Sequence, residues 1–114
     1  MIAMLRRRLM SNMAKAKNIA TGTFVGSGNR IQSISGIGFK PDHIAICLTT
    51  YNSDHSFVIC VYDTRLMKKN GASVQTSDAT LTFNDDGVVV TAPESVTGLD
   101  PVFIGTYAYV AWQD

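Results

Sequence analysis

DHIAICLTT at 42–50 and SFVICVYD at 56–63 are the two stretches of this chain that decide its fold. In an extended chain successive side chains point to opposite faces, so each stretch divides into two sets, and both sets are mainly apolar. The first stretch sets Ile44, Ile46 and Leu48 against His43, Ala45 and Cys47, and the second sets Phe57, Ile59 and Val61 against Val58, Cys60 and Tyr62. A sheet with one face in water would alternate apolar with polar residues. We therefore expect central strands that a second sheet covers on one face and a partner subunit covers on the other.

On either side of these stretches, β-branched and aromatic residues alternate with clusters of Gly, Asn, Asp and Ser, a pattern typical of strands and turns. The expected strands are 20–25, 29–35, 42–50, 56–63, 79–84, 87–92 and 104–113. The expected turns are 26–29, 51–54, 69–71 and 84–87, the last with a glycine able to take a positive φ. The sequence therefore predicts an all-β protein, an antiparallel β-sandwich of about six to seven strands.

The two cysteines belong to the two central stretches. Cys47 and Cys60 lie opposite each other if the connecting turn centres on Ser53 and Asp54. Two small buried thiols and a disulfide are both compatible with that pairing, and the thiols are the preferred interpretation. Neither cysteine has a C-x-x-C partner, so the cysteines indicate no zinc site and no cellular compartment.

The charge of the chain is divided unevenly along its length. Residues 1–18 hold five bases and no acid, whereas residues 19–114 hold five bases and nine acids. This division predicts a basic N-terminal arm, 1–18, joined to an acidic β-sandwich domain, 19–114.

The arm lacks Gly and Pro, and its composition favours a helix. Ile2, Leu5, Leu9 and Met13 form an apolar stripe at helical spacing, but about three turns of helix are marginal in water on their own. Three arginines interrupt the apolar run that a secretory signal needs. A flexible tail, a docking arm and an organellar transit peptide remain as interpretations. In the docking interpretation the partner-binding residues are Leu5, Arg6, Arg7, Arg8 and Leu9.

The sequence offers no catalytic constellation. His43 and His55 have no metal-ligand spacing, and the glycines of Ser35–Phe39 lack the third glycine and the helix of a nucleotide-binding loop. Asp85 and Asp86 belong to a turn rather than to a calcium loop. No uninterrupted apolar run reaches the roughly 18 to 20 residues of a membrane-spanning helix. We therefore expect no enzyme, no metal, no cofactor and no membrane insertion.

Aromatic residues near the loops and on the last strand are the candidate binding residues. Tyr51, Tyr107 and Tyr109 are candidates for a glycan site or a subunit interface, because an aromatic ring stacks on a sugar and also fills an interface. Trp112 has the opposite parity along its strand, so it lies on the other face from Tyr107 and Tyr109, and we expect it to be buried.

Four segments carry a resemblance to a known family. They are TGTFVGSGN at 21–29, SISGIGFKPDHIAI at 33–46, TFNDDGVVV at 82–90 and GTYAYVAW at 105–112. Their order resembles that of small β-sandwich domains in bacteriophage tail-fibre and related virion proteins, and the layout is similar to H-type lectins, which are six-stranded sandwiches that form trimers.

The resemblance implies a virion structural protein, such as a fibre, spike or decoration subunit, that assembles with other copies of itself as a homotrimer. The arm would contact neighbouring virion proteins. The alternative that the resemblance leaves open is a lectin-like receptor-binding module that recognises a bacterial surface glycan.

Overall fold

The computed structural model describes residues 17–50, 56–70, 73–94 and 100–114. In these residues the chain forms nine strands and no helix, so the expectation of an all-β protein is confirmed. The strands are β1 (Asn18–Val25), β2 (Ile31–Ile34), β3 (His43–Thr50), β4 (Phe57–Tyr62), β5 (Arg65–Asn70), β6 (Ser73–Asp78), β7 (Thr80–Asn84), β8 (Gly87–Thr91) and β9 (Thr106–Gln113).

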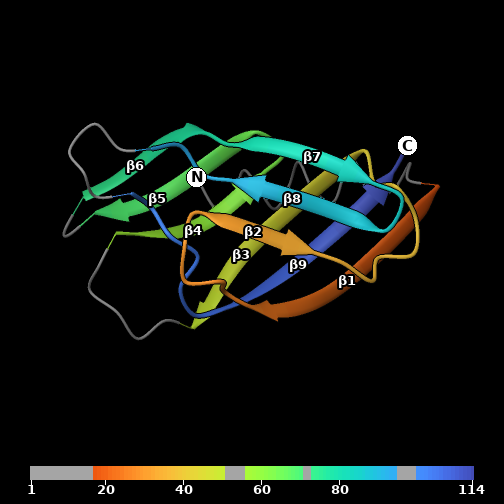
Figure 1. The fold of residues 1–114 in the computed structure, drawn as a ribbon, viewed down its shortest axis with the longest axis horizontal. Helices are drawn as coiled ribbons and strands as arrows, with labels where there is room; N and C mark the ends of the chain where they lie inside the picture. The colour runs from red at the N-terminus through yellow and green to blue at the C-terminus, as the bar shows by residue number, and fades with distance from the viewer. Residues whose placement is uncertain (1–16, 51–55, 71–72, 95–99) are drawn as a thin grey trace.

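The strands form two antiparallel sheets. The larger sheet has the order β1-β9-β3-β4-β5-β6, and the smaller has the order β2-β8-β7. In Figure 1 the smaller sheet lies across the middle of the larger one, and the hairpin end of β5 and β6 reaches beyond it. The larger sheet therefore has an inner face, which is turned toward the smaller sheet, and an outer face, which is turned away from it.

The expected number of six to seven strands was too low because the sequence did not reveal β5 and β6. Their sequences, RLMKKN and SVQTSD, are charged or polar and lack the alternation of a half-buried strand. Pairing with β4 makes β5 a strand, and Leu66 and Met67 are buried in it. Of the turn expected at 69–71, residues 69 and 70 belong to β5, where Asn70 pairs with Ser73, and residue 71 lies outside the described residues.

The core lies between the two sheets. Its largest fully buried side chains include Tyr107 of β9, Phe103 before it and Ile44 and Ile46 of β3. Val88 and Val90 of β8 are buried against them from the smaller sheet, together with Ile34, Ala79 and Ala92. Burying one such aliphatic side chain contributes roughly 1.5–3 kcal/mol, so this layer is the main source of stability.

The predicted pairing of the central strands is confirmed, with one correction. Cys47 lies directly opposite Cys60 in the register of β3 and β4. The strict alternation expected for β4 is wrong, because the register shifts between Val58 and Cys60, and Val58 and Val61 therefore belong to the same core cluster. A bulge adds one residue to a strand and so changes which face the following side chains meet.

The turn between β7 and β8 is as expected, but its glycine has another role. Gly87 is not among the glycines with positive φ. A Cβ at Gly87 would collide with the carbonyl oxygen of Ile34, so glycine is required because β2 approaches closely. Asp86 of this turn accepts hydrogen bonds from the amides of Gly36 and Gly38, each at 2.9 Å. The Gly-x-Gly loop therefore binds an anion, and that anion is the chain's own carboxylate.

Candidate functional site

The outer face of the larger sheet carries a second apolar cluster. Ala45, Tyr62, Val110 and Trp112 are all buried there, on three adjacent strands. The cluster continues to two further buried side chains on the same face, Cys60 and Met67. These side chains are buried rather than exposed, so they form a second apolar layer on the face that is turned away from the smaller sheet.

Trp112 is the centre of the outer cluster. Its exposed fraction is 0%. The imidazole of His43 stacks on its indole with the ring centroids 5.1 Å apart, and the ring of Tyr62 lies at 6.0 Å. The buried indole nitrogen has no hydrogen-bond partner in the part of the chain that the structure describes. A buried indole N–H normally finds an acceptor. The described strands supply neither an acceptor for this N–H nor a layer over the indole.

His43 stands at the rim of this face between two carboxylates. Its Nδ1 lies 3.0 Å from an oxygen of Asp63, and its Nε2 lies 2.9 Å from an oxygen of Asp114. Partial burial lowers the pKa of His43, but the hydrogen bonds and charges of Asp114 and Asp63 outweigh it and raise the pKa above its ordinary value. With both nitrogens facing acceptors, the imidazolium is the form that this geometry favours.

The same carboxylates also fix the backbone around His43. Asp63 accepts a hydrogen bond from the amide of Ile44 at 3.1 Å and itself adopts a φ of 50°. Asp42 accepts a hydrogen bond from the amide of Asp114 at 2.9 Å. Over the described residues, no group of three or more His, Cys, Asp or Glu side chains is arranged to hold a metal ion. We call the cluster of His43, Asp42, Asp63 and Asp114 the clasp, because its hydrogen bonds join the start of β3 to the residues that follow β4 and β9.

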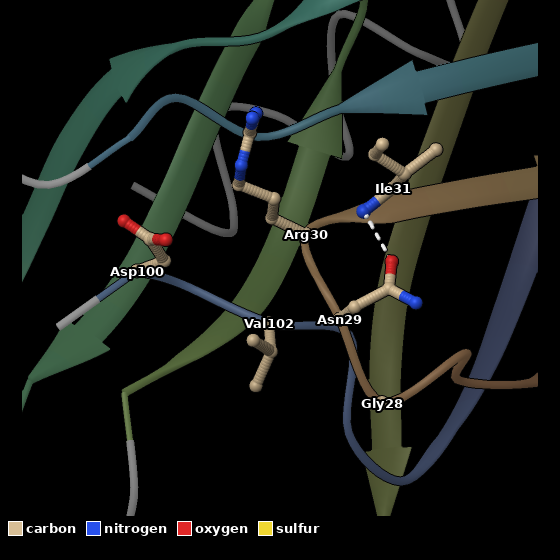
Figure 2. A pocket seen from close by; sticks show the side chains of 6 residues that line it. All are labelled: Gly28, Asn29, Arg30, Ile31, Asp100 and Val102. Carbon is tan, nitrogen blue, oxygen red and sulfur yellow. Dashed lines mark hydrogen bonds between the residues drawn. The ribbon is translucent and has the colours of Figure 1, made fainter.

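A hollow of about 560 Å³ opens at the start of β2. Figure 2 shows the six residues that line it: Gly28, Asn29, Arg30, Ile31, Asp100 and Val102. The side-chain oxygen of Asn29 accepts a hydrogen bond from the amide of Ile31, and the Arg30 guanidinium donates to the carbonyl of Ala92 and to Glu94. Amide, guanidinium and carboxylate groups thus surround an aliphatic surface, of which Ile31 is 48% exposed.

The edges of the larger sheet are β1 and β6. Val74 of β6 is 57% exposed, and five of the six residues of this strand are exposed. Val25 and Ile19 are large exposed apolar side chains on β1. An edge strand with exposed apolar residues and no proline or bulge is able to pair with another chain.

The two cysteines are not joined in a disulfide, and their thiols contact each other. Asp63 N donates to Ile44 O, so the alternation of an antiparallel ladder makes Cys47 and Cys60 a non-hydrogen-bonded pair, in which side chains are closest. A hydrogen bond with Cys47, together with burial, raises the pKa of Cys60. The expectation of two buried thiols holds for Cys60 only, because Cys47 is exposed.

The structure separates the residues that the sequence singled out. The arm residues Leu5, Arg6, Arg7, Arg8 and Leu9 lie outside the described residues, and so does Tyr51. Tyr107 is fully buried in the inner core, and its hydroxyl donates to the carbonyl of Val58 at 2.7 Å, so it presents no surface to a ligand. Tyr109 is half-buried against the same core. Trp112 is buried on the opposite face from both, as its parity predicted.

The edge strand β6 and the clasp around His43 were not evident from the sequence, whereas an apolar outer face on the central strands was expected. The apolar content of both faces of 42–50 was the available signal for the outer cluster. His43, Asp63 and Asp114 are far apart in the chain and have no motif spacing, so only the strand register brings them together.

Comparisons with protein-family models, with curated proteins and with solved structures find no match to this chain. Along its described residues, the chain has no helix of the length and apolar character that a membrane crossing requires.

Proposed function

We propose that this chain is a structural protein of a bacteriophage virion, a fibre, spike or decoration subunit that assembles as a homotrimer through its β-sandwich and its N-terminal arm. The family part of the proposal rests on the resemblance of the segments 21–29, 33–46, 82–90 and 105–112 to virion β-sandwich domains. The observation that carries the assembly is the exposed edge strand β6.

The direction of the β6 amides supports edge pairing. Ala79 N donates to Thr64 O at 2.7 Å, so 64 and 79 form a hydrogen-bonded pair in the ladder of β5 and β6. Alternation along that ladder turns the amides of Val74 and Thr76 away from β5, toward the free edge. In the described residues nothing pairs with that edge, and it lacks the lysine, proline or bulge that commonly blocks one.

The arrangement of the two edges favours a ring. Because β6 and β1 end the same sheet, β6 of one copy can pair with β1 of the next in a head-to-tail contact that repeats around a closed symmetry. The exposed Ile19 and Val25 of β1 would then be covered together with Val74. Three copies would close such a ring with every edge of the larger sheet paired.

The experiment is light scattering of the full chain, with Thr76→Pro and Thr76→Ser as a matched pair. Proline removes an outward amide without removing a bond to β5, so Thr76→Pro should convert trimer to monomer, whereas Thr76→Ser should remain trimeric. The copy number and position of the chain in a purified particle test the virion assignment. A wild-type chain that stays monomeric at micromolar concentration contradicts the assembly.

The hollow beside β2 favours a second candidate, a receptor-binding module for a bacterial surface glycan. Asn29, Arg30 and Asp100 supply the amide, guanidinium and carboxylate groups that hydrogen-bond sugar hydroxyls, and Ile31 supplies an apolar surface. A glycan array with the full chain tests it. Arg30→Ala should abolish any binding and Arg65→Ala, a control on β5, should preserve it; an array without signal excludes this candidate.

A further inference from the structure

Cys47 and Cys60 are the two cysteines of the chain, and the register of the central strands sets them opposite each other. Asp63 N donates to Ile44 O, so 44 and 63 form a hydrogen-bonded pair between β3 and β4. Pairs of the two kinds alternate along an antiparallel ladder, so three residues further along β3 the two cysteines form a non-hydrogen-bonded pair. In such a pair the side chains approach each other most closely.

The separation of such a pair suits a disulfide, at the short end of its range. The Cα atoms of a non-hydrogen-bonded pair are about 4.5 Å apart. A disulfide joins residues whose Cα atoms are about 4.4 to 6.8 Å apart, and most often about 5.5 to 6 Å apart. The two cysteines are thus within reach of each other without movement of the strands. A disulfide formed at so short a separation is strained, and a strained disulfide is reduced more easily than a relaxed one.

The side chains are arranged for reaction with a dissolved reagent. The two thiols contact each other, and Cys47 is exposed. The hydrogen bond with Cys47, together with burial, raises the pKa of Cys60. Cys60 is therefore held protonated while the pair is reduced, and Cys47 is the thiol that a reagent meets first.

We infer that Cys47 and Cys60 form a redox site, which a low-molecular-weight disulfide converts into a reversible cross-strand disulfide. This inference goes beyond the proposed function and does not depend on it. It assigns a chemical role to a pair of side chains on the outer face that the proposed assembly through β6 does not use.

The reaction is a thiol–disulfide exchange in two steps. In the first, the Cys47 thiolate attacks one sulfur of the reagent RSSR, so that a mixed disulfide forms at Cys47 and one thiolate RS⁻ leaves. In the second, Cys60 loses its proton to solvent, and its sulfur attacks Sγ of Cys47 and displaces the second RS⁻. The two cysteines together lose two electrons and two protons, and the reagent takes up both and becomes two molecules of RSH.

The position of this bond gives it a structural consequence. In the described residues the paired stretch of β3 and β4 runs from Ala45↔Tyr62 to Cys47↔Cys60, and it is the shortest in the larger sheet. This stretch joins β1, β9 and β3 to β4, β5 and β6. The cysteines are its last pair, so a disulfide fastens the end of the ladder at the middle of the sheet. Oxidation thus adds a covalent bond where the strands share the fewest paired residues.

The test is incubation of the full chain with oxidised glutathione, followed by mass spectrometry and a thiol assay in denaturant. Because the chain has two cysteines, an internal disulfide has one possible position. We expect the wild type to lose both thiols and about 2 Da, the mass of the two hydrogens that the reagent takes up. An excess of reduced glutathione should restore both thiols while circular dichroism shows the chain folded throughout.

Two variants separate the steps and the geometry. Cys60→Ser should stop after the first step and retain one glutathione on Cys47. The matched control is Cys47→Ser with Thr49→Cys, which keeps two cysteines and moves the first to another exposed position of β3. Diagonal neighbours of two strands are about 7 to 8 Å apart, beyond the reach of a disulfide. This control should accumulate the mixed disulfide and close to an internal disulfide many-fold more slowly than wild type.

Other outcomes overturn the inference. A folded wild type that keeps both thiols, or that retains glutathione without closing, shows that the pair is not a redox site. Closure of the control as fast as wild type shows that the register does not place the reaction. A disulfide that reduced glutathione opens only in denaturant contradicts reversibility, and a disulfide between two chains, seen as a doubled mass, contradicts the pairing. Should Cys60→Ser unfold, Cys60→Ala repeats the first-step measurement.

Discussion

The two faces of the larger sheet are built from the same strands but are buried by different means. On the inner face, Tyr107 packs between Phe24 and Phe103, at 5.2 and 5.6 Å, and the strands of the smaller sheet complete the layer. On the outer face, Trp112 contacts His43 and Tyr62, and no described strand lies over it. Two equally buried aromatic residues on one strand can thus pack against different parts of the chain, so substitutions of Tyr107 and of Trp112 should depend on different neighbours.

The largest expected effect is on the inner face. Tyr107→Ala should lower the free energy of unfolding by about 4 to 5 kcal/mol, because it leaves a cavity among Phe24, Phe103 and the strands. Chemical denaturation followed by circular dichroism measures it. Because Tyr107 and Trp112 belong to separate clusters on opposite faces of the sheet, the loss should be additive with that of Trp112→Ala. A coupling above about 0.5 kcal/mol would show that the two faces are not independent.

The next effect is on the outer face. Trp112→Ala should cost about 3 to 4 kcal/mol in the wild-type background, since a fully buried indole is removed. Combined with His43→Ala, it should cost less than in the wild-type background, because the imidazole that stacks on the indole is already absent. The same denaturation experiment, monitored by circular dichroism because the tryptophan is lost, measures both values. Full additivity would mean that the stacking of His43 on Trp112 contributes nothing to stability.

How much of each face could be predicted depends on whether its residues form a recognisable pattern in the sequence. Alternation in 42–50 identified β3 and its two apolar faces, and the position of the following turn was enough to predict the pairing of Cys47 with Cys60. The strands β5 and β6 could not be predicted, because their polar residues become strands only through pairing with β4. Propensity is weak where pairing and burial decide the conformation.

The candidate sites were harder to predict than the fold. Tyr107 is an aromatic residue on the face opposite Trp112, which made it a candidate interface residue. Only the position of the smaller sheet shows that it is in the core. The clasp of His43 with Asp63 and Asp114 depends on a register in which Ile44 lies opposite Asp63 and His43 lies opposite Trp112. Such a contact between distant residues leaves no local pattern in the sequence.

A third and smaller effect concerns the polar group within the inner core. Tyr107→Phe keeps the ring but removes the hydroxyl that donates to Val58 O and accepts from the amide of Ile104 at 3.2 Å. The loss should be about 1 to 3 kcal/mol, since two buried backbone groups lose a partner. Comparison with Tyr107→Ala then divides the contribution of this residue into ring and hydroxyl. If Tyr107→Phe leaves the free energy of unfolding unchanged, water satisfies those groups and the inner layer is less dry than its burial indicates.

The smallest expected effect is at the rim of the outer face, where His43 stacks on Trp112. The charges and hydrogen bonds of Asp114 and Asp63 raise the pKa of His43 above 6.5 in the folded chain, although burial opposes them. A raised folded pKa means that the stabilisation is fully present below the unfolded value of about 6.5 and is lost as pH rises through the folded pKa.

Because the side chain of His43 is 30% exposed, solvent screening limits this stabilisation to below about 1 kcal/mol. The measurement is the difference in the free energy of unfolding between wild type and His43→Gln across that pH window, which also cancels any contribution from His55 and from Asp42 nearby. The wild type should lose its advantage as pH rises, and Trp112 emission should change with it, since the stacked imidazole loses its charge. A difference that is constant with pH would mean that the pKa of His43 is the same in the folded and the unfolded chain, and that the two carboxylates add no net stabilisation to its charged form.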